Sequence, residues 1–77
     1  MQRFGEKLRT LRQKRSLSLR QLGDLLGVYH NHVAQLESGK RIPNAAMILK
    51  IADIFGVSTD VLMRDELDLG AEGGAES

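Results

Sequence analysis

The sequence predicts an all-α protein, a compact bundle of five short helices within 77 residues. Apolar residues recur along the chain at spacings of three and four, which is the period of one helix face. Capping residues precede these runs and glycines follow them, so they mark where helices begin and end. No segment alternates polar and apolar residues in the way a half-buried strand does.

The first two helices are predicted at residues 3–14 and 19–26. Three apolar residues share one face of the first, with basic side chains on its other faces: Phe4, Leu8 and Leu11. The second begins with a capping-box pattern, in which the Ser18 hydroxyl accepts from a first-turn amide while Gln21 reaches back. Gly27 ends it, because glycine takes the left-handed conformation without steric cost. Its inward residues are expected to be Leu22, Leu25 and Leu26.

The remaining helices are predicted at residues 29–38, 45–55 and 59–64. A glycine follows each of the first two, and Asn44 and Ser58 are the expected N-caps of the last two. The inward residues of these helices are expected to include Val33, Leu36, Ile48, Ile51, Ala52 and Phe55.

Composition limits the kinds of function. A single domain of this size buries about 60% of the surface that its unfolded chain exposes, so an enclosed enzyme cleft is hard to build. The chain has no cysteine, which excludes disulfides, thiolate zinc sites and thiol nucleophiles. No catalytic set of residues is visible, and we expect neither enzymatic activity nor a cofactor. No apolar run approaches the roughly 18 residues of a membrane span and no signal peptide opens the chain, so a cytoplasmic protein is expected.

Opposite charges divide the chain. Residues 1–41 hold nine basic and three acidic side chains, a net charge of +6, whereas residues 42–77 hold two basic and seven acidic ones, a net charge of −5. This division fits a basic face for a polyanion and an acidic end directed away from it, although solvated surface charge explains it equally well. We expect a helical domain over residues 1–64 and an acidic, Gly/Ala-rich, disordered tail over residues 65–77.

A helix-turn-helix is predicted over about residues 18–38. Two short helices joined by a tight turn require an apolar residue at Leu22, a small one at Gly23 and the turn itself at Gly27. Three further apolar residues would hold the second helix against the first: Val28, Val33 and Leu36. An ordinary helical hairpin in a bundle is the alternative, but it does not require all six residues.

With these residues and their neighbours, the chain resembles the phage-repressor type (Cro/C1, XRE) of helix-turn-helix proteins. The resemblance covers about residues 4–63 and rests on the motifs Gly5-Glu6-Lys7-Leu8-Arg9, Leu26-Gly27-Val28, Leu36-Glu37-Ser38-Gly39-Lys40-Arg41, Leu49-Lys50-Ile51-Ala52 and Phe55-Gly56-Val57-Ser58. It implies a lambda-repressor-like five-helix domain whose third helix lies in the major groove of DNA. The chain departs from the family pattern with Leu19 where Gln is frequent, Tyr29 where Ser or Thr is frequent, and Gly23 in place of Ala.

Base-reading residues are expected on the exposed face of the third helix. If Val33 and Leu36 face inward, the helical period turns five residues outward, of which the first four are the base-reading candidates: His30, Asn31, Ala34, Gln35 and Ser38. The amides of Asn31 and Gln35 can pair with adenine N6 and N7, and the Ala34 methyl can meet a thymine methyl. The resemblance implies base reading by His30, Asn31 and Gln35. The alternative is that they are only polar surface residues.

Phosphate contacts are expected around this helix and at the start of the second. The candidates are Ser18, Arg20, Tyr29, Ser38, Lys40, Arg41 and Asn44. The resemblance implies phosphate contacts for Lys40 and Arg41, and Arg20 with the first-turn amides of its helix would form another anion site. Two alternatives stay open, since Arg41 could enter the minor groove and Tyr29 could pack instead of donating its hydroxyl.

Arg12 and Glu37 are expected to have a structural role. The resemblance implies a partly buried salt bridge between them, which would orient the third helix. The two histidines do not suggest a metal site. His30 and His32 would point about 200° from each other on a helix, so they cannot share an ion.

The expected partner is double-stranded DNA with an inverted-repeat operator. One recognition helix covers only a few base pairs, so we expect a homodimer on half-sites about one helical turn apart. Its interface is predicted at Ile54, Val61 and Met63. Transcriptional regulation, most often repression in this family, is the first interpretation. The second is a protein-interaction module of the same fold, such as an antitoxin or partner-recruiting factor, which would bind a protein through the acidic tail.

Overall fold

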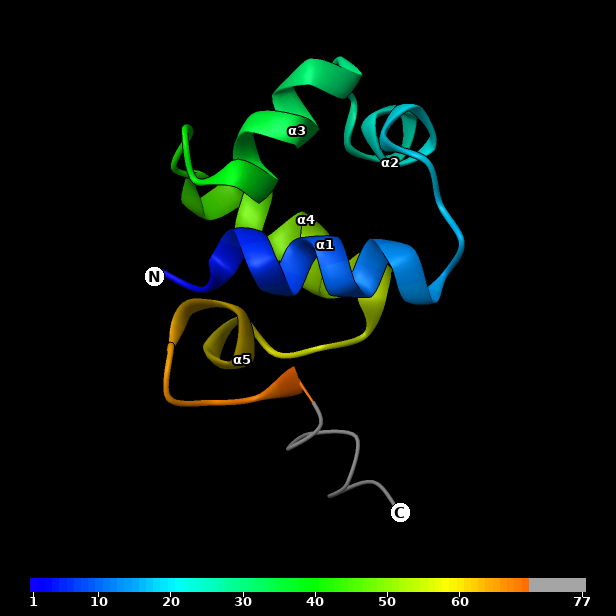
Figure 1. The fold of residues 1–77 in the computed structure, drawn as a ribbon. Coiled ribbons are helices and arrows are strands. Elements are labelled where there is room, and N and C mark those ends of the chain that lie inside the picture. The colour runs from blue at the N-terminus through cyan, green and yellow to red at the C-terminus, as the bar shows by residue number, and fades with distance from the viewer. Residues whose placement is uncertain (70–77) are drawn as a thin grey trace.

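The computed structural model describes residues 1–69. This part of the chain contains five helices and no strand. In chain order they are α1 (Phe4–Lys14), α2 (Leu19–Leu26), α3 (His30–Ser38), α4 (Ala45–Phe55) and α5 (Thr59–Met63). The predicted all-α, five-helix fold is confirmed, with every helix boundary within one residue of its expected position. Figure 1 shows α2 and α3 at one end of the molecule, α5 at the opposite end, and α1 and α4 between them.

The helix ends follow from the local sequence. At the start of α2 the Ser18 hydroxyl accepts from the Gln21 amide at 3.0 Å, and the Ser18 amide donates to the Gln21 side chain at 2.8 Å. The predicted capping box therefore forms. The Asn44 side chain caps α4 by accepting from an amide three residues on, at 2.8 Å. Gly27 ends α2 at a φ of 77°, in the left-handed region.

The apolar core lies where the five helices meet. α3 packs against both α1 and α2, while α5 packs against α1 and α4. The buried apolar residues are Phe4, Leu8, Leu11, Leu22, Leu26, Val33, Leu36, Ile48, Ile51, Ala52, Phe55, Val61 and Leu62. Every helix contributes to this core, and α3 is held in position by its packing against α1 and α2.

Leu25 stays outside this core, which contradicts its predicted inward orientation. Its side chain is 49% exposed, whereas Leu22 and Leu26 are buried. Residues four apart lie on nearly the same stripe of a helix, and Leu25 lies about 60° to the side of Leu22. The buried residues of α2 are Leu22, Gly23 and Leu26.

Two glycines inside helices allow close approach of backbone segments. A Cβ atom on Gly5 would lie 2.6 Å from the Leu36 carbonyl oxygen and closer still to that of Glu37, so α1 crosses α3 at a point where no side chain fits. A Cβ atom on Gly23 would lie 2.6 Å from the Val28 carbonyl oxygen in the turn. The predicted need for a small residue at position 23 is confirmed, with the turn as the nearest neighbour.

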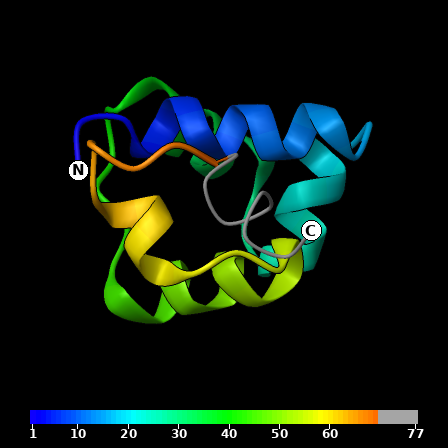
Figure 2. The ribbon, with the colours of Figure 1, turned by 90° about the horizontal axis from the view of Figure 1, so that it is seen from below.

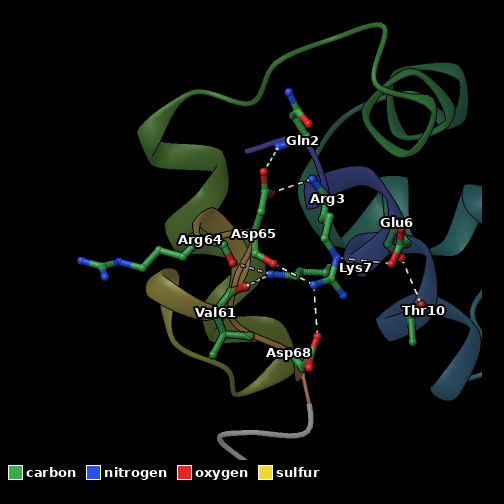
Figure 3. A network of polar contacts seen from close by, with 9 residues as sticks. All are labelled: Gln2, Arg3, Glu6, Lys7, Thr10, Val61, Arg64, Asp65 and Asp68. Atoms are coloured by element: carbon green, nitrogen blue, oxygen red, sulfur yellow. Dashed lines mark hydrogen bonds and ion pairs between the residues drawn. The ribbon is translucent and has the colours of Figure 1, made fainter.

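Lys7 lies in the core, although the sequence predicts solvated basic residues on this part of α1. The residue is 1% exposed, and its ammonium donates to the carbonyl oxygens of Val61 at 2.6 Å and Arg64 at 2.8 Å. The last carbonyls of a helix lack partners within it and carry partial negative charge. The Lys7 ammonium therefore caps the end of α5 and ties it to α1 (Figure 3).

Asp65 fastens the chain after α5 to the start of α1. Its carboxylate accepts the backbone amides of Gln2 at 2.9 Å and Arg3 at 2.8 Å. These bonds, first from Arg3 and then from Gln2, lower the pKa of the Asp65 carboxyl. In return, the Arg3 guanidinium donates to the Asp65 carbonyl oxygen at 2.7 Å. Figures 2 and 3 show this segment beside the start of α1.

Residues 65–69 therefore belong to the folded domain, which corrects the predicted boundary after residue 64. Arg3 also pairs with Asp68, with Nη1 and Oδ1 3.1 Å apart. Leu69 packs against the core. The rest of the predicted acidic tail, residues 70–77, lies outside the described residues.

Candidate nucleic-acid interface

The exposed side of α3 carries the predicted base-reading residues. Val33 and Leu36 are buried, and their positions turn the opposite side of the helix outward. The four candidates reach the surface, the first two exposed and the last two half-buried: His30, Asn31, Ala34 and Gln35. Amides, an imidazole and a methyl group are therefore placed along one accessible helix, and these are groups that can contact base edges.

The loop after α3 is fastened to the main-chain carbonyl oxygen of Gln35. That oxygen accepts from the Lys40 amide at 3.0 Å, the Arg41 amide at 3.2 Å and the Ser38 hydroxyl at 3.2 Å. Gly39, at a φ of 83°, lets the chain turn back at this point. Lys40 and Arg41 are exposed, so two cations lie at the end of α3. The Ser38 hydroxyl already has a partner within the helix end.

The side chains of Arg41 and Gln35 are also joined. Nε of Arg41 donates to Oε1 of Gln35 at 3.1 Å. The two residues contribute to a hollow in the surface, together with Val28, Tyr29, Asn31 and His32. Sequence spacing carries no signal for this contact, because it depends on how the loop turns back after Gly39.

Arg12 and Glu37 form the predicted salt bridge between α1 and α3. Arg12 makes two contacts with the carboxylate, Nε to Oε2 at 2.6 Å and Nη2 to Oε1 at 3.2 Å. The two side chains are 13% and 8% exposed. A third bond, from Arg12 Nη1 to the Leu17 carbonyl oxygen at 2.9 Å, adds the loop before α2. The hydrogen bond with Glu37 raises the pKa of Arg12, and the pair neutralises an acidic residue on α3.

The start of α2 presents a cation and free backbone donors. Arg20 is exposed. The capping box engages the Ser18 and Gln21 amides, whereas the amides of Leu19 and Arg20 have no acceptor within residues 1–69. Donors of this kind at a helix N-terminus favour anions.

Tyr29 and Asn44 are the remaining members of the predicted phosphate-contacting set. Tyr29 is the N-cap of α3, makes no side-chain cap bond and is 84% exposed. It therefore does not pack against the domain, which removes one of the two alternatives for it. Asn44 is exposed as well, and its oxygen caps α4.

Several basic side chains of the N-terminal half make contacts within the domain that stabilise the fold. Arg15 lies over the Phe55 ring, 5.4 Å from its centroid. Three others have partners within the domain: Arg3, Lys7 and Arg12. The net charge of residues 1–41 thus overstates the positive charge that a ligand could meet. On α2, α3 and the loop that follows, the exposed basic residues are Arg20, Lys40 and Arg41.

Comparison with known proteins assigns the family. The sequence matches the helix-turn-helix domain family over residues 3–67. The chain belongs to this family. It is 39% identical over 64 residues to the HTH-type transcriptional repressor RghR of Bacillus subtilis, covering 82% of this chain and 47% of that protein. It is 36% identical over 63 residues to the HTH-type transcriptional activator BcrR of Enterococcus faecalis, covering 82% and 31%. The chain spans about half the length of the first curated relatives that it matches.

Solved helix-turn-helix structures have the same fold. The P22 c2 repressor, in complex with a synthetic operator, aligns with a TM-score of 0.76 and 27% identity over 82% of this chain and 96% of that one. The restriction-modification controller protein C.AhdI from Aeromonas hydrophila aligns with a TM-score of 0.71 and 32% identity, over 80% and 94%. The predicted resemblance to phage repressors and the repressor-like five-helix fold are confirmed.

Of the three residues predicted at a dimer interface, Met63 alone is well exposed in this helix-turn-helix domain. Val61 is 3% exposed, because it packs inward from α5, so it offers no surface to a second copy. Ile54 is half-buried and packs against the core. Met63 is 44% exposed and provides most of the apolar surface among the three.

Two further observations concern metal ions and membranes. Within residues 1–69, no three His, Cys, Asp or Glu side chains gather closely enough to hold a metal ion. None of the described helices is both long and apolar enough to cross a membrane.

Proposed function

We propose that this helix-turn-helix protein is a sequence-specific DNA-binding transcriptional regulator, acting as a repressor, that reads the major groove with α3. The observation that carries the proposal is the arrangement around α3. A helix with outward amide groups is held rigidly by the core and the Arg12–Glu37 pair. Exposed cations lie at its C-terminal end and at the start of α2. An α-helix fits the major groove of B-DNA.

Base discrimination is assigned to three polar residues of α3 and one methyl group. Asn31 and Gln35 each carry an amide that can pair with adenine N6 and N7, so we expect at least one A·T pair in each half-site. His30 can donate to or accept from a base edge. The Ala34 methyl can contact a thymine methyl.

Phosphate contacts are assigned to the groups that flank α3. Lys40 and Arg41 provide charge after its last turn, and Arg20 adds charge and a free amide at the start of α2. The exposed Tyr29 hydroxyl can donate to a phosphate at the other end of α3. Ser18, Ser38 and Asn44 have weaker cases, because each side chain has a partner within the domain. Such contacts fix the register of a protein on the duplex without reading its sequence.

We further propose that the protein acts as a homodimer on an inverted repeat, because one recognition helix covers only a few base pairs. The dimer surface would centre on Met63, with the exposed part of Ile54 at its edge. A protein that regulates bacterial or phage genes in this way works in the cytoplasm. RghR is named a repressor, and the P22 c2 repressor was solved on an operator; both names support this role.

Selection of binding sites from a random duplex pool tests the proposal, at about 0.15 M salt where weak charge contacts are screened. We expect an inverted repeat to be enriched, and the preference at particular base pairs of each half-site to be lost with Asn31→Ala or Gln35→Ala. Asp53→Ala on the exposed side of α4 is the control that should select the same site. If the wild type enriches nothing and binds only weakly in a salt-sensitive way, the proposal is wrong, and a protein partner becomes the function to seek.

A further inference from the structure

We propose that Arg41 is a positioning residue for base recognition, which fixes the orientation of the Gln35 amide and thereby the order of donor and acceptor that Gln35 presents to DNA. This inference rests on the proposed function, because it assigns a role within the same reading face. Orienting Gln35 is a second role for Arg41, in addition to a contact with phosphate.

The main chain places Arg41 beside Gln35. The Arg41 amide donates to the Gln35 carbonyl oxygen at 3.2 Å, and the neighbouring Lys40 amide donates to the same oxygen at 3.0 Å. Gly39 makes this return possible through its left-handed conformation. The Arg41 side chain therefore starts from a fixed point next to the last turn of α3.

The side-chain bond permits only one orientation of the amide. Nε of Arg41 lies 3.1 Å from Oε1 of Gln35. A guanidinium has donors and no acceptor, so only the amide oxygen can face it. Rotating the Gln35 amide by 180° would set its NH2 group against another donor. The oxygen thus lies on the Arg41 side and the NH2 group lies on the other side.

This orientation matters for sequence recognition. Adenine presents N7 as an acceptor and N6 as a donor in the major groove, and an amide reads both at once only when its oxygen meets N6 and its nitrogen meets N7. An amide that rotates freely can satisfy either order. An amide fixed by Arg41 accepts only one, so it distinguishes an A·T pair from its reverse. Exclusion of water by the duplex would strengthen the exposed bond between the two side chains.

Arg41 can also contact phosphate while it holds Gln35. A guanidinium has five N–H groups, and the bond to Gln35 uses one of them. The terminal nitrogens of Arg41 have no protein partner within residues 1–69. One side chain can thus join a sequence-independent contact to a sequence-dependent one, and an experiment has to separate the two.

Lys40 provides the matched control. It is the adjacent residue of the same loop, it is exposed, and it has the same charge. Within residues 1–69 its side chain makes no hydrogen bond to α3. Loss of a phosphate contact weakens binding about equally for all sequences and lowers the salt dependence by about one ion. Loss of amide orientation weakens the preference at particular base pairs.

The experiment measures the affinity of the selected duplex and of duplexes changed at one base pair at a time. We expect Gln35→Ala to abolish the preference at one or two base pairs, and Arg41→Ala to reduce it roughly tenfold at those same pairs. Arg41→Ala should add nothing to this loss when Gln35→Ala is already present. Arg41→Lys, which keeps the charge but lacks Nε, should lose the same preference while it keeps the salt dependence. Lys40→Ala should weaken every duplex equally.

Two results would overturn the inference in distinguishable ways. If Arg41→Ala weakens every duplex equally, as Lys40→Ala does, while Gln35→Ala still alters particular base pairs, Arg41 is only a phosphate contact and the proposed function stands. If the wild type prefers no sequence at all, the proposed function fails and this inference fails with it.

Discussion

Arg12 and Glu37 form a largely buried polar contact between α1 and α3. Both side chains are largely buried, and the carboxylate has two contacts with the guanidinium. The resemblance to phage repressors predicts this pair. By contrast, Lys7 and the carbonyls of Val61 and Arg64 are 54 and 57 residues apart in the sequence. Backbone carbonyls carry no residue identity, so the sequence offers no sign of that contact.

Truncating Arg12 should lower stability before it affects any binding. Arg12→Ala would leave the Glu37 carboxylate buried without its partner, which costs about 3 kcal/mol of the free energy of unfolding. Urea denaturation measures this loss. Arg9→Ala, an exposed residue of the same helix, should change the free energy by less than about 0.5 kcal/mol. An Arg12→Ala protein with wild-type stability that has lost DNA binding would show that Arg12 contacts DNA.

Asp65 should make stability depend on pH in the acid range. Its carboxyl has a lowered pKa in the folded protein because the amides of Arg3 and Gln2 bond to the charged form. The stabilisation is therefore complete above the unfolded-state pKa, which is about 3.9, and is lost as the pH falls through the lower folded-state value.

Thermal unfolding of Asp65→Asn tests this prediction. Its midpoint should lie below that of the wild type at pH 7, and the gap should narrow steadily below about pH 4. Asp53→Asn, on the exposed side of α4, should show no such narrowing. A gap that stays constant down to pH 2 would mean that the charge on Asp65 does not stabilise the fold.

At the scale of the element, the crossing of α1 and α3 is a feature that the periodicity and capping residues of single helices do not predict. Caps and glycines predict both ends of α2 and α4, the end of α3 and the start of α5, because they act through local backbone geometry. They do not reveal which helices cross, so they gave no reason to single out Gly5. For the same reason, the sequence predicts that Leu25 faces inward and that Val61 lies at a surface, whereas Leu25 is exposed and Val61 is buried.

Gly5→Ala should destabilise the protein despite the better helix propensity of alanine. Propensity favours the change by about 1 kcal/mol, but the new methyl group would collide with the carbonyls of Leu36 and Glu37. Overpacking of this kind costs about 3 kcal/mol, so the net loss is about 2 kcal/mol. Gly39→Ala, where no atom lies within 4 Å of the added Cβ, should lose only about 1 kcal/mol through its left-handed conformation. A more stable Gly5→Ala protein in urea denaturation would contradict the close crossing.

At the scale of the whole molecule, the two ends differ in the charged residues that they carry. The α2–α3 end carries Arg20, Lys40 and Arg41, and the described segment after α5, residues 65–69, lies at the opposite end (Figure 1). The charge division of the sequence predicts this arrangement, but it does not predict the internal use of so many cations. Asp65 and Asp68 bond to the start of α1, so two of the acidic residues after α5 already have partners within the domain.

The fold and the helix that carries the candidate site could thus be predicted from the sequence. Apolar period, caps and turn glycines specify them locally. The contact between Arg41 and Gln35 and the packing of residues 65–69 could not be predicted. The first depends on how the loop turns back after Gly39, and the second on how segments far apart in the sequence meet. A single sequence records neither.

The central claim is that α3 reads DNA sequence, and one comparison of affinities tests it most directly. The affinity of the protein for its selected duplex is measured at about 0.15 M salt beside a duplex of the same length and composition with both half-sites scrambled. We predict a ratio of at least about 1,000, the lower range for specific over non-specific binding. Equal affinities for the two duplexes would contradict the account, because the charges of Arg20, Lys40 and Arg41 would then be sufficient to explain all binding.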